Sequence, residues 1–348
     1  MPGSKKIVKT KTLTEEPSEI SEPIYEKVTR ILDQSLRLFW EEVKNFYRQK
    51  WFAAFAILMV LPMIFILVPY AIKQYPIYIN QVHISMFLNG IYSDDGAIIT
   101  FRDIFAQIMG VGIISFGGFA TLYYTGIPII AIVTLLTSGI IASERDKGTL
   151  PIYVSKPIYR TQLVLTKFLA FAFVSLILTA AVFYTMYFIL AFSILGPLGL
   201  FSEGIKYTIY AANTIVIIVW FFIITVGSIT TLFSSIVDRP LLAGVISLMY
   251  LLVTYIFSKF PMRFLGDLGD ALKYIDPSSL SNTLLNVHVL GLDYYRTIWD
   301  IITMPGGGLF ASALLGQIDP TIAVILLVSI ILVTITIACI ITEKREVK

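Results

Sequence analysis

The chain has 348 residues, of which 57% are hydrophobic and 14% are charged, and its mean hydropathy is +0.81. Soluble globular domains carry charge on about a quarter of their residues, so this composition excludes a water-soluble domain and is typical of a chain whose solvent is lipid. The formal net charge of +3 gives no reason to expect nucleic acid as a partner.

The first 50 residues divide into two parts of different character. Residues 1–24 are polar, with a basic cluster followed by an acidic one and no signal peptide, which predicts a disordered cytoplasmic tail. Residues 25–50 carry apolar side chains at helical spacing among charged ones, which predicts an amphipathic interfacial helix on the inner membrane surface. This helix could be a membrane anchor, or a scaffold that helps a cytoplasmic partner hold the membrane domain.

Six runs of about 20 apolar residues predict membrane-spanning helices. The runs are 51–72, 119–142, 163–190, 208–233, 241–257 and 321–341. Their only charged residue is Lys167, near the start of the third run, and we expect its ammonium to reach the lipid headgroups. Residues 104–116 are too short to span, and Asp300, Pro305 and three glycines interrupt residues 298–318. We therefore expect extracellular re-entrant or interfacial helices before the second and last spans.

The distribution of basic residues predicts the orientation. With six spans and a cytoplasmic N-terminus, 19 of the 26 Lys and Arg residues fall in inward-facing segments. A seventh span at 104–116 would move the most basic loop outside, against the enrichment of cytoplasmic loops in basic residues. The sequence thus predicts an all-α polytopic membrane protein with six transmembrane helices and both termini in the cytoplasm. Its membrane domain is 51–342, with an inward loop at 143–161, a long outward segment at 258–320 and a cytoplasmic tail at 343–348.

The inward loop between spans two and three is the most distinctive segment. Seven charged residues fall within 144–167, between two apolar spans. Gly148 can close the turn that contains Glu144 as a helix C-cap, and Pro157 suits the first turn of the next helix. The loop is predicted to be a charged helix–turn–helix at the inner face, which would offer a docking surface to a soluble protein.

This loop resembles that of the permeases of ABC-type exporters of the second class. The residues that carry the resemblance are Glu144, Arg145, Asp146, Gly148, Thr149, Ser155, Pro157, Ile158, Arg160 and Lys167. The family usually has Glu where Asp146 stands, and often has Glu-x-Leu-Leu where Pro-Ile-Tyr-Val stands at 151–154. The agreement in topology extends over nearly the whole chain from residue 25.

The resemblance implies a six-helix permease subunit of an exporter, in the cell membrane, that pairs with a second permease copy as a homodimer or a related heterodimer. It implies separate ABC ATPase subunits that bind ATP and magnesium, and no catalytic activity or cofactor in this chain. In accord with that, the sequence has no Gly-x-x-x-x-Gly-Lys-Ser/Thr run to hold ATP phosphates. The residues it implies for coupling to the ATPase are Glu144, Arg145, Asp146, Gly148, Thr149, Pro157 and Arg160.

Several of these residues have a second interpretation. Arg145 and Arg160 could pair with the ATPase or bind lipid phosphates, and Gly148 and Thr149 suit a cap and a turn. Candidates for lining a pathway are Thr134, Thr137, Ser138, Ser247, Tyr250 and Thr254. Small hydroxyl residues also permit close helix packing, and the pair Tyr123-Tyr124 also suits an interfacial belt. A pathway lined in this way would suit an apolar or amphipathic cargo.

Other chemistry finds little support in the sequence. His83 and His288 lie in different outward segments without an acidic pair at ligand spacing, and the single Cys339 allows neither an intrachain disulfide nor a cysteine-based metal site. Two other classes of function stay open. A secondary transporter or channel would need intramembrane charges or a filter, and a membrane anchor or scaffold subunit would need no pathway.

Overall fold

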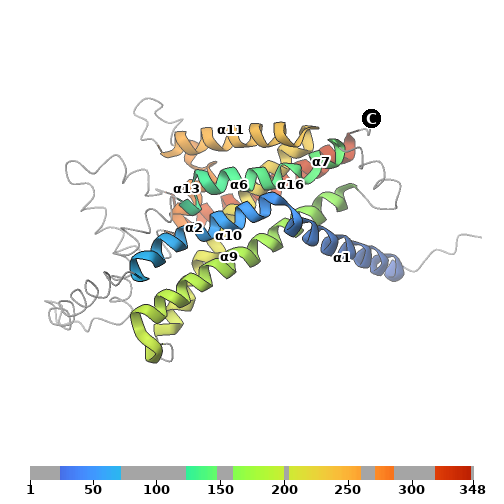
Figure 1. The fold of residues 1–348 in the computed structure, drawn as a ribbon. Helices are drawn as coiled ribbons and strands as arrows, with labels where there is room; N and C mark the ends of the chain where they lie inside the picture. The colour runs from blue at the N-terminus through green and yellow to red at the C-terminus, as the bar shows by residue number, and fades with distance from the viewer. Residues whose placement is uncertain are drawn as a thin grey trace, which may run out of the picture.

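The computed structural model describes residues 24–71, 123–146, 160–199, 204–259, 271–285 and 318–345. Within these ranges the regular structure is helical (Figure 1). The helices are α1 (Ile24–Arg48), α2 (Lys50–Ala71), α6 (Ile127–Thr137), α7 (Gly139–Asp146), α9 (Arg160–Gly199), α10 (Gly204–Ile236), α11 (Pro240–Lys259), α13 (Pro277–Leu285) and α16 (Pro320–Lys344). The predictions for residues 1–23, 104–116 and 298–317, and for the two histidines, lie outside the described residues.

Five helical stretches are long and apolar enough to cross a membrane. They are Ile127–Asp146, Arg160–Thr185, Ala212–Ile236, Pro240–Ser258 and Pro320–Lys344, which confirms a multi-pass helical membrane protein. Helix α2 occupies the place of the predicted first span, and its part Lys50–Leu61 is a shorter apolar helix among the described residues. The sixth span, the domain boundaries and the orientation stay predictions.

Helix α10 forms the centre of the bundle. It packs against α6, α7, α9, α11, α13 and α16. The buried share of its membrane-spanning stretch is 72%, compared with 28% for α16 and 33% for α11. Helix α9 approaches α10 closely at Gly227, where an added Cβ would lie 2.9 Å from Cζ of Phe171. A side chain at this position is therefore incompatible with the observed packing of α9 on α10.

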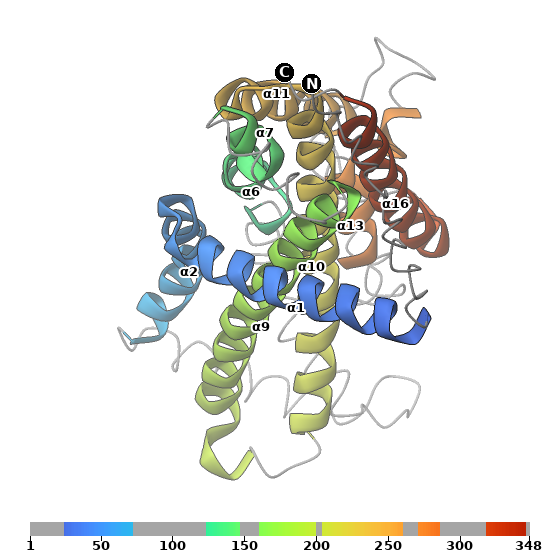
Figure 2. The same cartoon turned by 90° about the vertical axis from the view of Figure 1, so that its right-hand side faces the viewer.

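Helix α1 crosses α9 and then turns into α2 at Gln49 (Figure 2). Val43 and Phe46 are buried on the side facing α9, and the rings of Phe46 and Phe171 lie 6.1 Å apart. An adjacent stripe of Leu32, Leu36 and Trp40 stays 54–57% exposed. Helix α1 occupies the range of the predicted interfacial helix, and its apolar residues divide between two surroundings. One stripe packs on protein, and the other is available to lipid.

The predicted second span is broken and displaced. It begins at Ile127, after the extended Gly126, and is interrupted at Ser138, where α6 ends and α7 starts. Ser234 of α10 stabilises the break, because its hydroxyl accepts the backbone N–H groups of Ile141 and Ala142 at 3.1 and 2.9 Å. The span therefore continues through Asp146, and the charged residues before 147 belong to its last turn.

Helix α13 is a short helix with all nine residues buried, in the predicted outward segment 258–320. Asp276, itself fully buried, caps its first turn by accepting the backbone N–H groups of Ser278 and Ser279 at 3.2 and 3.0 Å. The hydroxyl of Ser258 in α11 donates to the same carboxylate at 2.5 Å. A cap of this kind satisfies amide groups that the helix itself cannot, and here it also attaches α13 to α11.

Candidate functional site

Charged side chains gather at one end of the bundle, where α7, α10 and α16 end and α9 begins. They form two groups. The buried triad consists of Glu42, Glu144 and Lys167, and the arginine clasp consists of Arg145, Arg160, Asp238 and Arg345. Residues 147–159, within the predicted inward loop 143–161, connect the end of α7 to the beginning of α9.

The buried triad joins three helices. Nζ of Lys167 in α9 lies 3.0 Å from Oε1 of Glu42 in α1 and 3.1 Å from Oε1 of Glu144 in α7. The Lys167 side chain is only 7% exposed, and those of Glu42 and Glu144 are 10% and 17% exposed. Buried ions of this kind are tolerated when each is paired and hydrogen-bonded. The expectation that Lys167 reaches lipid headgroups is wrong, because two carboxylates from other helices hold its ammonium inside the protein.

The arginine clasp closes the ends of α10 and α16. Arg145 donates to the backbone carbonyl of Ser235 at 2.7 Å, and Arg345 donates to the same carbonyl at 3.2 Å and to that of Ile236. Asp238 lies 3.8 Å from Arg145 and 3.1 Å from Arg345.

Arg160, the first residue of α9, completes the clasp by donating to the carbonyl of Arg345 at 2.8 Å. The last carbonyls of a helix have no partner within it, and guanidinium groups supply one here. The clasp therefore fixes the beginning of α9 and the end of α7 to the ends of α10 and α16.

The structure describes four of the seven residues predicted for coupling. Glu144 belongs to the triad, Arg145 and Arg160 belong to the clasp, and Asp146 is exposed at the end of α7. Gly148, Thr149 and Pro157 lie outside the described residues. Neither arginine is occupied solely with solvent or lipid, since each binds a backbone carbonyl of this chain. A role for all seven in binding an ATPase stays a prediction.

The residues predicted to line a pathway belong to α6, its C-cap and α11, and these two helices pack together. Thr134, Thr137, Ser138, Ser247 and Thr254 are buried, and each hydroxyl donates to a backbone carbonyl three or four residues before it. Close approach is visible at Gly244, where an added Cβ would lie 3.2 Å from Cβ of Ser138. Tyr250 is 37% exposed. These contacts correspond to the alternative of close helix packing, and the lining role stays a prediction.

The two tyrosines before α6, Tyr123 and Tyr124, form hydrogen bonds to α2. The hydroxyl of Tyr123 donates to the carbonyl of Leu58 at 2.8 Å, and that of Tyr124 donates to the carbonyl of Met59 at 2.9 Å. Tyr124 is only 2% exposed, so the expectation of an interfacial belt is wrong for this residue.

Three members of these two groups, Glu42, Asp238 and Arg345, were not among the predicted site residues. Glu42 is one of the charged residues of the predicted interfacial helix. It shares the spacing of a single helical face with Phe39 and Phe46, and a lone acid on an apolar stripe is a signal of pairing. Asp238 and Arg345 gave no such signal. They belong to short charged segments of a kind that is common wherever a membrane-spanning helix ends in the cytoplasm. Among the described residues, no group of three or more His, Cys, Asp and Glu side chains is placed to hold a metal ion.

Five membrane-length helices, four of them joined at one end by buried and clasped charges, define the chain as a multi-pass membrane protein with a polar junction at one end. Residues 36–346 match the family described as ABC-2 family transporter protein. The chain therefore belongs to this family and is an ABC transporter permease, as its loop had suggested. A comparison with curated proteins finds no match.

Proposed function

We propose that this permease belongs to an exporter and couples to separate ATPase subunits at the end of the bundle that carries the triad and the clasp. ATP and magnesium would bind to those subunits, and this end would face the cytoplasm together with both termini. The observation that carries the proposal is the buried triad, which connects α1 to the two helices flanking the loop 147–159.

The triad and the clasp provide a mechanical connection from the loop to the rest of the bundle. A displacement of the loop would pull on Glu144 and Arg160, at the two helix ends next to it. Through Lys167 it would reach α1, and through Arg345 it would reach α16. Because ATP-driven motion must shift the populations of inward-open and outward-open states, a junction that connects five helices suits this task.

A second permease copy would complete the pathway. Helix α11 presents an apolar stripe of Leu242, Val245, Met249 and Val253, each 46–61% exposed. Pairing of two copies along α6 and α11 would bring Tyr250 and the hydroxyl residues of these helices near a central pathway, which favours an apolar or amphipathic cargo. An identical second copy would give a homodimer, and a related permease chain would give a heterodimer.

Co-purification with an ATPase tests the proposal. The chain should be isolated from its native membrane with a stoichiometric ATPase, and Arg160→Ala should lower Mg-ATP turnover of the complex by roughly tenfold, because it opens the clasp at the start of α9. The matched control is Arg37→Ala, which removes an exposed arginine paired with Asp33 at 2.8 Å and should leave turnover unchanged.

Isolation of the chain as a lone oligomer with no nucleotide-binding partner would refute the proposal. That outcome would favour a non-transporting membrane anchor or scaffold if no transport is found in reconstituted vesicles. It would favour a secondary transporter if vesicles transport without ATP.

A further inference from the structure

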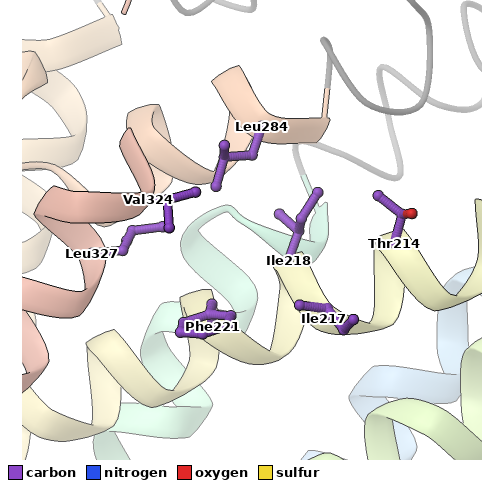
Figure 3. A pocket seen from close by; sticks show the side chains of 7 residues that line it. All are labelled: Thr214, Ile217, Ile218, Phe221, Leu284, Val324 and Leu327. Atoms are coloured by element: carbon purple, nitrogen blue, oxygen red, sulfur yellow. The ribbon is translucent and has the colours of Figure 1, made fainter. Parts of the chain in front are cut away.

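A cavity of about 310 Å³ lies between α10, α13 and α16. Figure 3 shows seven side chains that line it, four from α10 and the others from α13 and α16. They are Thr214, Ile217, Ile218, Phe221, Leu284, Val324 and Leu327. None of them belongs to the triad, the clasp or the α6–α11 contact, so the proposed function leaves this cavity unexplained.

The cavity has an open side and a closed side. Ile217 and Val324 are 50% and 44% exposed, whereas Ile218, Leu284 and Leu327 are at most 6% exposed. The first two therefore mark its mouth and the last three its floor. Helix α13 closes the floor because its face with Leu280 and Leu284 packs on α10 and α16.

Water does not suit this cavity. Six of the seven lining residues are apolar, and a buried water needs two to four polar partners, while cavities lined by Leu, Ile and Phe stay dry even at about half this volume and bind apolar molecules instead. An unfilled space of this size would also forfeit the dispersion contacts of its whole lining. The occupant is therefore apolar.

The position of the mouth identifies the source of that occupant. Residues 214–221 and 324–327 lie inside the two membrane-spanning stretches Ala212–Ile236 and Pro320–Lys344. Val324 is four residues after Pro320, about 6 Å along the helix, so the mouth opens into hydrocarbon near one edge of the bilayer. At that depth the apolar molecules at high concentration are phospholipid acyl chains.

We propose that this cavity is a lipid site that holds one acyl chain of a bilayer phospholipid between α10 and α16, against α13. The bound chain fills the space that three helices leave between them and thereby stabilises the position of α13. The site does not depend on ATPase coupling, since it concerns only a membrane-embedded surface.

The test counts phospholipids retained by the protein. Wild-type protein, assembled in nanodiscs of palmitoyl-oleoyl phosphatidylcholine and released for native mass spectrometry, should retain one phosphatidylcholine per chain. Val324→Trp and Ile217→Trp fill the mouth from α16 and α10, and each should lower retention by roughly tenfold or more, because loss of contact for two methylene groups already has that effect. The matched control is Val333→Trp, at an exposed position (55%) of α16 that does not line the cavity, and it should retain the lipid.

Two blocking variants from different helices keep the test decisive if one of them fails to fold. Equal retention in Val324→Trp, Ile217→Trp and wild type would overturn the proposal, and so would equal loss in Val333→Trp. A retained molecule whose mass is not that of the phospholipid would overturn the assignment of its source. Since none of these outcomes involves ATP hydrolysis, failure here is distinguishable from failure of the proposed function.

Discussion

Removal of the ammonium group from the buried triad should destabilise the protein strongly. In Lys167→Met the side chain keeps its approximate volume, but Glu42 and Glu144 lose the cation that both contact at 3.0 and 3.1 Å. Their two carboxylate oxygens can be no more than about 6 Å apart, since both contact one nitrogen, so their repulsion is about 3 kcal/mol at an effective dielectric constant of 20. Breaking a buried ion pair on one side typically costs about 3–5 kcal/mol.

We therefore expect Lys167→Met to lower the free energy of unfolding by about 3 kcal/mol, and Tm by roughly 5 °C or more. Thermal unfolding in one detergent, followed by intrinsic fluorescence, measures this change. Combining Lys167→Met with Glu42→Gln and Glu144→Gln should restore most of the lost stability, because the repulsion disappears. The control Lys44→Met removes an exposed lysine of α1 and should change Tm little.

The reasoning fails if Lys167→Met unfolds at the wild-type temperature, or if the triple variant is less stable than the single one. In the first case the two carboxylates are not held together by Lys167. In the second case the hydrogen bonds of the carboxylates, and not their charges, determine the energy of the junction.

Two further substitutions test contacts within the bundle. Gly227→Ala should destabilise by about 1–3 kcal/mol because its methyl group overlaps the ring of Phe171, and Phe171→Leu in the same chain should recover part of the loss in a Tm measurement. Asp276→Ala should cost about 2–3 kcal/mol, since it leaves the buried donors of Ser258 and Ser279 unpaired. The exposed cap of α16 provides the comparison, and Asp319→Ala should cost only about 1 kcal/mol; equal costs for the two caps would contradict the role given to burial.

Hydropathy predicts both the existence and the approximate range of a helix when local sequence signals determine where that helix begins and ends. Helix α16 is the clearest example, with a predicted range of 321–341 and observed bounds of Pro320–Lys344. Its start coincides with an acidic cap followed by proline, both readable in the sequence.

The break at Ser138 was not predictable in this way, because it is stabilised by a hydroxyl of α10 that lies far away along the chain. Lys167 illustrates the same limit at the site. Near the end of an apolar run a lysine is expected to reach the headgroups, and only the crossing of α1 over α9 shows that Glu42 is within reach of it. Periodicity identifies which residues share a face, but it does not tell whether lipid or another helix covers that face.

The length of α9 has a consequence for the shape of the molecule in its membrane. A helix of 40 residues is about 60 Å long, twice the roughly 30 Å thickness of the hydrocarbon core, and even a tilt of about 40° leaves it more than 40 Å tall. At least one end of α9 must therefore extend beyond the hydrocarbon core, and its C-terminal end points away from the charged junction. Figure 2 shows α9 and α10 extending together in that direction. A binding protein directed to this end of α9 and α10 would therefore lie on the side of the bundle opposite the junction.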